Sequence, residues 1–162
     1  MRFSKGENGR ALESELPAVV ARCREDGAAL SDLQAVYDQV NGAVAAAGLS
    51  CLGGGTCCRF DLAEHRLYLS GLELALLTVE PPPDLRRAEQ MRCPYQLGPA
   101  CAAYPRRPLG CRSFFCSPGK KVFLREIHEQ SHRRIRRLHQ TLCIPYTYGE
   151  ICQLLLQFYS RK

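Results

Sequence analysis

Cysteines are the residues of this chain whose number and spacing point most directly to chemistry. The sequence has ten cysteines in 162 residues, and most of them gather in two groups. The first group ends in the adjacent pair Cys57-Cys58, and the second lies within residues 93–116. Together the two groups comprise Cys51, Cys57, Cys58, Cys93, Cys101, Cys111 and Cys116. Because a thiolate held inside a protein needs a nearby cation, we expect both groups to close on one metal centre.

Disulfides and buried free thiols are the two other uses of cysteine that the count allows. The first ten residues carry charges with no apolar stretch behind them, so we expect no secretory signal and a reducing cytoplasm around the chain. Cys57 and Cys58 are adjacent, which is a poor arrangement for a bond between them. Metal binding is therefore favoured over both alternatives.

The number of cysteines bounds the kind of metal. Four thiolates suit a tetrahedral zinc ion or a [4Fe–4S] cluster. Seven exceed one four-ligand site, so either some lie outside the ligand set or the centre holds more than one metal. The chain lacks the paired C-x-x-C knuckles of a zinc finger, and the gap between Cys58 and Cys93 is long. The spacing thus predicts a metal and leaves open iron–sulfur or zinc, with a structural or a redox role.

The cysteine segment also carries a recognisable motif. Cys57-Cys58 is followed by Cys93-Pro94, by Cys101, and by the run Y-P-R-R-P-L-G-C-R-S-F at residues 104–114. These residues resemble the YkgJ-like, or CxxCxxCC, cysteine-cluster family over residues 51–116. The family is described as zinc- or iron-chelating, and a related segment occurs in flagellin lysine N-methylases, which is compatible with an iron–sulfur centre.

The resemblance implies a set of ligands in this chain. They are Cys51, Cys57, Cys58, Cys93, Cys101 and Cys111. Gly54 stands where the family commonly has a further cysteine, and Cys116 lies one short loop from Cys111, where it can compensate.

Three residues of the same segment are expected beside the metal. Guanidinium groups donate hydrogen bonds to sulfur and offset the charge of a thiolate site, which favours this role for Arg107 and Arg112. A surface position is the alternative for Arg112. Tyr104, together with Phe114, is expected to pack over the centre and limit the access of solvent.

A second motif competes with the cysteines. His128-Glu129-Gln130-Ser131-His132 matches H-E-x-x-H, which on a helix presents two zinc ligands and a general base, with His139 or Glu150 as a third ligand. The surrounding sequence is polar, whereas zinc-protease helices are apolar around this motif. A solvated helix face is therefore favoured over a zinc-dependent hydrolase.

The stretch after this motif is basic. Its arginines are Arg133, Arg134, Arg136 and Arg137. A run of this kind can contact nucleic acid, which we keep as a third hypothesis below a solvated face. The net charge of +6 permits an anionic partner without requiring one, so the partner is a protein or a small molecule not yet defined.

Helical periodicity surrounds the cysteine segment. We expect a helix from about residue 13 to 27 with Pro17 in its first turn, and a second opened by a capping box at Ser31. Another capping box at Ser70 and Glu73 predicts a short helix through Leu77. A long helix over residues 120–142, with Val122 among its core residues, and a helical tail over 147–162 follow. Residues 60–69 suggest one or two short strands.

These elements predict a mainly α fold in one domain, 1–162, around a loop-rich, metal-bound cysteine cluster, with one short β hairpin left open. Its parts are a flexible tail (1–10), a helical hairpin (11–50), the cysteine-cluster core (51–116) and C-terminal helices (117–162). A hydrophobic content of 46% argues against disorder, and no apolar run is long enough to span a bilayer. Cys23, Cys143 and Cys152 are expected to be packing residues. His65 is expected to be an exposed loop histidine, with a ligand role as the alternative.

Overall fold

The computed structural model describes residues 8–51, 54–63, 65–115 and 118–160. Helices dominate, which confirms the mainly α prediction. The α-helices are α1 (Asn8–Glu25), α2 (Ala29–Ala46), α3 (Gly71–Leu77), α4 (Leu109–Ser113), α5 (Lys121–Thr141) and α6 (Ile151–Tyr159). Short 3₁₀ turns are η1 (Thr56–Cys58), η2 (Leu85–Gln90), η3 (Tyr104–Arg106) and η4 (Pro118–Lys120). The strands are β1 (Tyr68–Ser70), β2 (Gln96–Leu97), β3 (Ala100–Cys101) and β4 (Tyr148–Glu150).

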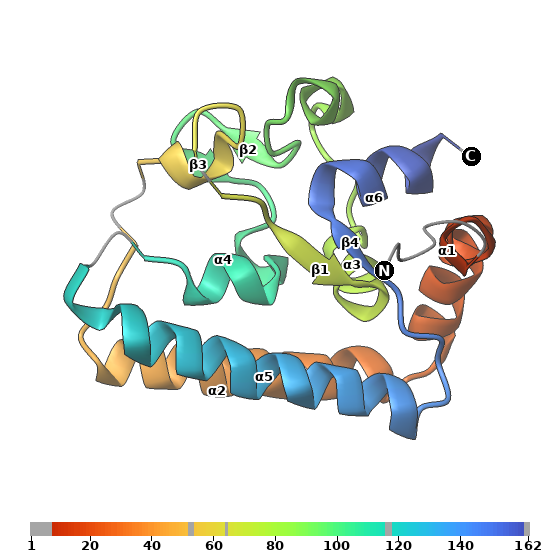
Figure 1. Ribbon diagram of the computed structural model, residues 1–162, viewed down its shortest axis with the longest axis horizontal. Coiled ribbons are helices and arrows are strands. Elements are labelled where there is room, and N and C mark those ends of the chain that lie inside the picture. Colours follow the sequence, from red (N-terminus) through yellow and green to blue (C-terminus); the bar gives the residue numbers. More distant parts are fainter. Residues whose placement is uncertain (1–7, 52–53, 64, 116–117, 161–162) are drawn as a thin grey trace, which may run out of the picture.

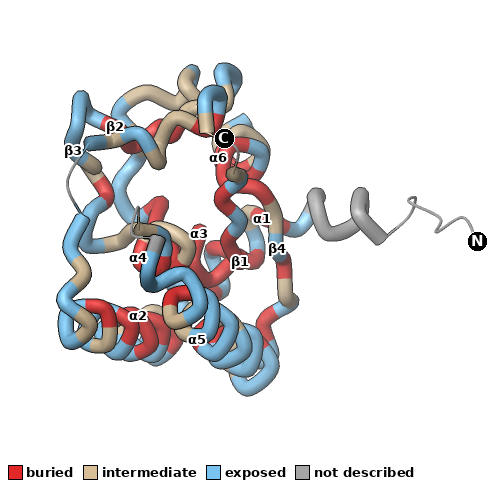
Figure 2. The backbone as a smooth tube through the Cα atoms, turned by 60° about the vertical axis from the view of Figure 1, so that its left-hand side comes forward, coloured by how far each residue is buried: buried red, intermediate tan, exposed pale blue. Residues whose placement is uncertain are grey.

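Two long helices, α2 and α5, lie side by side along one edge of the molecule (Figure 1). In α2 the buried residues Leu33, Val36, Tyr37 and Val40 recur at helical spacing, so they form one apolar face. On α5 the fully buried Ile135 contributes to the same core. Figure 2 shows buried stretches along α2 and through α3 and β1, with exposed stretches on the outer sides of α2 and α5.

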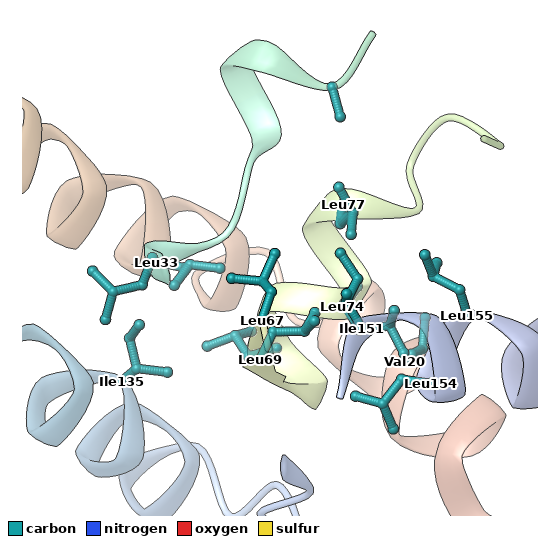
Figure 3. Close-up of a cluster of buried hydrophobic side chains, with 14 of the residues drawn as sticks. Val20, Leu33, Leu67, Leu69, Leu74, Leu77, Ile135, Ile151, Leu154 and Leu155 are labelled. Carbon is teal, nitrogen blue, oxygen red and sulfur yellow. The ribbon is translucent and has the colours of Figure 1, made fainter. Parts of the chain in front are cut away.

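The short helix α3 lies at the centre of the fold. All its residues are buried except Leu76, and Leu74 and Leu77 face Ile151 and Leu155 of α6 and Val20 of α1 in the core (Figure 3). A helix of this length is stabilised by its packing, because its few hydrogen bonds cannot offset the cost of nucleation. The predicted capping box at Ser70 and Glu73 is present, and α3 ends at Leu77 as expected.

Two antiparallel strand pairs complete the fold. β2 and β3 form a short hairpin with Gln96 opposite Cys101, outside residues 60–69 where strands were expected. β1 pairs instead with the distant β4, with Tyr68 opposite Glu150 and Ser70 opposite Tyr148. The prediction of helix from residue 147 is therefore wrong for Tyr148–Glu150, because pairing with β1 holds this segment extended before α6 begins.

The N-terminal helices differ from prediction at their boundaries. α1 begins at Asn8, inside the expected tail, so Pro17 lies within the helix and not in its first turn. Residues 1–7 lie outside the described parts of the chain. α2 begins at Ala29 and not after Ser31, because Asp26 Oδ1 accepts the N–H groups of Ala28 at 3.0 Å and Ala29 at 3.2 Å. The carboxylate of Asp26 thus replaces the predicted cap.

Two residues expected in the core are exposed. Val122 is 60% exposed, whereas Leu124 in the same turn of α5 is buried, so Val122 lies on the outer side of that helix. Cys143 is also exposed, in a left-handed turn with φ +52° that ends α5. Cys23 and Cys152 are buried, as expected of packing residues. Over the described ranges, no helix combines the length and the apolar character needed to cross a membrane.

Candidate metal centre

Backbone contacts join the two cysteine groups across the long gap between them. The Cys93 N–H donates to the Cys58 carbonyl at 2.9 Å, and Gln96 Nε2 donates to the Gly55 carbonyl at 3.0 Å. Gln96 is also the strand partner of Cys101, so the β2–β3 hairpin lies against η1. The turn that carries Cys58 is therefore fixed to the segment that carries Cys93 and Cys101.

The close approach of these segments requires glycine at position 55. Gly55 has φ +67°, in the left-handed region that side chains disfavour. A Cβ atom there would lie 2.7 Å from Gln96 Nε2 and 3.3 Å from the Gly98 carbonyl oxygen. Gly55 therefore lets the Cys57-Cys58 turn dock on the hairpin.

Helix α4 brings Cys111 to the same place, and Glu73 fixes α4. Glu73 is 2% exposed, and its Oε1 accepts the Leu109 N–H at 2.9 Å and the Tyr37 hydroxyl at 3.2 Å. Its Oε2 accepts the Ser70 N–H at 2.8 Å. One buried carboxyl group thus connects α2, α3 and the first turn of α4. The sequence predicted the role of Glu73 in the capping box, but no local pattern indicated its hydrogen bonds to Tyr37 and Leu109.

The thiols of the two groups lie near enough to change one another's ionisation. Hydrogen bonding to Cys58, followed by burial, raises the pKa of Cys57 far above its ordinary value. For Cys58 the hydrogen bond with Cys57 lowers the pKa, but the hydrogen bond with Cys93 and burial outweigh it and raise the pKa to about 12. Burial is also the main cause that raises the pKa of Cys101.

Cys111 interacts with three of these cysteines. Burial raises its pKa most, and the neighbouring charges of Cys58, Cys101 and Cys57 raise it further. Five cysteines from η1, the start of the hairpin, β3 and α4 therefore share one site. They are Cys57, Cys58, Cys93, Cys101 and Cys111.

The donor chemistry of this site fits a thiophilic metal. Several thiols held together resist losing their protons, and a cation bound among them reverses that preference, since thiolate is the ligand form. As the side chains stand, no three or more His, Cys, Asp or Glu residues of the described ranges form a ready-made ligand set. Binding a metal through three or more of these cysteines thus requires their side chains to rearrange.

Arg107 lies beside the cysteines. Its charge lowers the pKa of Cys57, Cys101 and Cys111 against the stronger effects that raise them. Its guanidinium carbon stands 4.0 Å from the ring centre of Tyr104, and its buried Nε has no hydrogen-bond partner. Arg107 therefore acts on three of the thiols and keeps a donor available, while Arg106 also lowers the pKa of Cys101.

Arg112 has a different position. It is 3% exposed, which excludes the surface alternative. Its guanidinium donates to the carbonyls of Arg107 at 2.8 Å and Pro105 at 2.6 Å, and to Asn41 Oδ1 at 3.1 Å. These bonds fasten the loop that carries Arg107 onto α2, so Arg112 acts on the site by positioning that loop.

The aromatic residues around the cysteines are only partly covered. Tyr104 is 53% exposed and Phe114 is 46% exposed. Phe114 stacks on His65 with 4.6 Å between ring centres, and His65 Nε2 lies 3.2 Å from the Cys57 carbonyl oxygen. The prediction of an exposed loop histidine is wrong, because Phe60 and Phe114 flank the ring.

Two predicted ligands are not among these five. Cys51 is exposed and lines a cavity of about 490 Å³ together with Tyr104, Arg107 and Arg112. Cys116 lies outside the described residues. The ligand assignments of Cys51 and Cys116 stay predictions.

The three functional residues of the H-E-x-x-H motif, which lies on α5, each contact a different partner. His128 Nδ1 lies 2.8 Å from Ser113 Oγ, and burial, with the charge of His132, lowers the pKa of His128. His132 Nε2 lies 2.8 Å from the Tyr146 hydroxyl. Glu129 is exposed and pairs with Arg133 at 3.7 Å. The proposed general base thus forms an ion pair on the outer surface of α5.

The two candidates for a third ligand lie in the core. His139 is 1% exposed with its ring edge on Tyr146, at 5.1 Å between ring centres, and neither ring nitrogen has a hydrogen-bond partner. Glu150 is 4% exposed and accepts the Gln153 N–H at 3.0 Å, where it caps α6. Glu150 therefore has a structural partner already.

The basic run on α5 also makes contacts within the molecule. Arg134 donates to Gln39 of α2, and Arg136 lies 5.3 Å from the ring centre of Tyr146. With Arg133 paired to Glu129, three of the four arginines have partners in this chain.

Comparison of the chain with protein-family models, with curated proteins and with solved structures finds no match in any of the three. The resemblance to the cysteine-cluster family therefore stays a prediction from the motif.

Proposed function

We propose that this chain is a metal-binding protein that holds an iron–sulfur cluster or zinc through Cys57, Cys58, Cys93, Cys101 and Cys111. The observation that carries the proposal is that the fold brings these cysteines together from segments far apart in the sequence, as the bond from the Cys93 N–H to the Cys58 carbonyl shows. Clustered cysteines with no disulfide between them supply several soft sulfur ligands at one place, which suits zinc or an iron–sulfur cluster.

The residues around the thiols suit this role. Arg107 would offset the negative charge of a thiolate site and donate its unpaired Nε–H toward sulfur. Arg112 would hold that loop in place, while Phe114 and His65 limit water on one side. The metal itself would supply either a crosslink between the loops, if zinc, or an electron-carrying centre, if iron–sulfur. Cys51 and Cys116 are the further ligand candidates that the motif implies.

A zinc hydrolase built on His128 and His132 is less well supported. Its general base, Glu129, pairs with Arg133 on the exposed side of the helix. Both histidines already have hydroxyl partners, Ser113 and Tyr146.

The substitution His128→Ala separates the two functions. We expect the metal content of the purified variant to equal that of the unmodified chain, because His128 is no ligand of the cysteine centre. Metal analysis of both proteins, isolated side by side, measures this. Loss of the metal in His128→Ala, with the fold retained by circular dichroism, would favour the hydrolase and contradict the cysteine centre.

A further inference from the structure

A cavity of about 750 Å³ opens above the clustered cysteines. Part of its lining is formed by Cys57, Cys58, Cys93 and Cys111. The rest comes from Phe60, residues 65–68, residues 110–115, the N-terminal part of α5 and Tyr148 of β4. The volume falls within the range of about 300–1,000 Å³ that is typical of small-molecule sites. The cysteines form only part of this lining, so a metal held by them would not account for the cationic and aromatic residues of the other walls.

The charge of the cavity has one sign. Arg66, Lys121 and Arg125 line it, and none of the described lining residues is an aspartate or glutamate. Within the described ranges, none of these three cations forms an ion pair. Three cations without a carboxylate partner attract an anion, and because all three are exposed, each contributes the modest attraction of a solvated charge.

Charged and polar side chains of the cavity lie along one face of α5. Lys121, Arg125 and His128 recur at helical spacing, so they line the cavity from the same side of the helix. Below them, Ser113 Oγ lies 2.8 Å from His128 Nδ1, which adds a hydroxyl to the same wall. The cavity therefore has a polar side along α5.

The remaining walls are aromatic. His65 stacks on Phe114, and Tyr68 stacks on Tyr148 with 5.8 Å between ring centres. Phe114 is 46% exposed and Tyr68 is 47% exposed, although both line the cavity, so apolar surface faces solvent there. Rings of this kind stack on planar apolar groups.

From these observations we infer that the cavity binds a small organic anion with a planar apolar body, of the class of aromatic carboxylates. Its carboxylate meets Lys121 and Arg125, and its ring lies against Phe114 above the cysteines. This site goes beyond the proposed metal centre, with which it shares its cysteine lining, and the residues proposed to hold the anion, Lys121, Arg125 and Phe114, are not metal ligands.

The test titrates the full-length protein, as isolated, with 2-naphthoate and with its neutral counterpart 2-naphthamide in a calorimeter. We expect saturable one-to-one binding, with naphthoate at least about tenfold tighter than naphthamide. The double substitution Lys121→Gln/Arg125→Gln removes that preference and leaves the affinity for naphthamide unchanged. Phe114→Ala weakens the binding of both compounds, because it removes the stacking surface that they share.

Arg86→Gln/Arg137→Gln is the matched control, since both arginines are exposed and lie outside the cavity. It removes the same charge and is expected to leave both affinities unchanged. Equal affinity for the two compounds, no saturable binding of naphthoate, or an equal loss in the control would overturn the inference. Metal analysis of the same samples keeps this outcome separate from that of the metal centre.

Discussion

Substitution of Cys58 by serine is expected to lower the metal affinity of the protein by at least about 100-fold. Loss of groups that merely orient a ligand costs about 10–100-fold, so loss of a ligand at the middle of the site should cost no less. Cys58 is the thiol that contacts both Cys57 and Cys93, and its charge also acts on Cys111. The measurement is a competition titration against a chelator of known affinity, with the Cys58→Ser variant and the unmodified protein prepared in parallel.

Cys143→Ser is the control for this experiment. Cys143 is an exposed cysteine outside the cluster, so its loss tests whether removal of any thiol lowers the affinity. We expect the Cys143→Ser protein to bind metal as the unmodified chain does. Equal affinities in the Cys58→Ser and Cys143→Ser proteins would rule out Cys58 as a ligand.

Glu73→Ala is expected to lower the free energy of unfolding by about 4 kcal/mol. The substitution leaves the N–H groups of Ser70 and Leu109 and the hydroxyl of Tyr37 without their partner. Each buried donor that loses its partner costs about 1–3 kcal/mol. Because domains are stable by only about 5–15 kcal/mol, this is a large share of the total. Urea denaturation followed by circular dichroism measures it.

Two further variants make this result interpretable. Glu73→Gln keeps one acceptor oxygen but turns an amide N–H₂ toward a donor, so we expect an intermediate loss. Glu126→Ala removes an exposed glutamate from α5 and should change stability by no more than about 0.5 kcal/mol. A Glu73→Ala protein as stable as the Glu126→Ala protein would show that Glu73 does not hold α4 in place.

The sequence predicted best those features whose residues lie close together in the chain. The capping box at Ser70 and Glu73 was correct, because every group that forms it lies within one turn of α3. The cap predicted from the similar pattern at Ser31 was wrong, since Asp26 accepts the N–H groups of Ala28 and Ala29 and the helix begins there. A short motif thus fails where a neighbouring side chain competes for the same backbone donors.

The sequence predicted least about contacts between segments that lie far apart in the chain. Nothing near Tyr148 marks a strand, because its partner β1 lies far earlier in the chain. His65 likewise had no local signal for its position between Phe60 and Phe114. The metal hypothesis required the cysteine groups to meet, and the Cys93–Cys58 backbone bond brings them together. The spacing could not reveal the aromatic and cationic cavity beside them, since its walls come from segments far apart in the sequence.

The most direct test of the central claim is metal and sulfide analysis of protein isolated without oxygen, with an absorption spectrum of the same sample. The account predicts a stoichiometric metal. Either iron and sulfide appear in matching amounts with broad charge-transfer absorption in the visible range, or zinc appears in a colourless protein. Folded protein that contains neither metal, and that takes up neither when iron with sulfide or zinc is supplied, would contradict it.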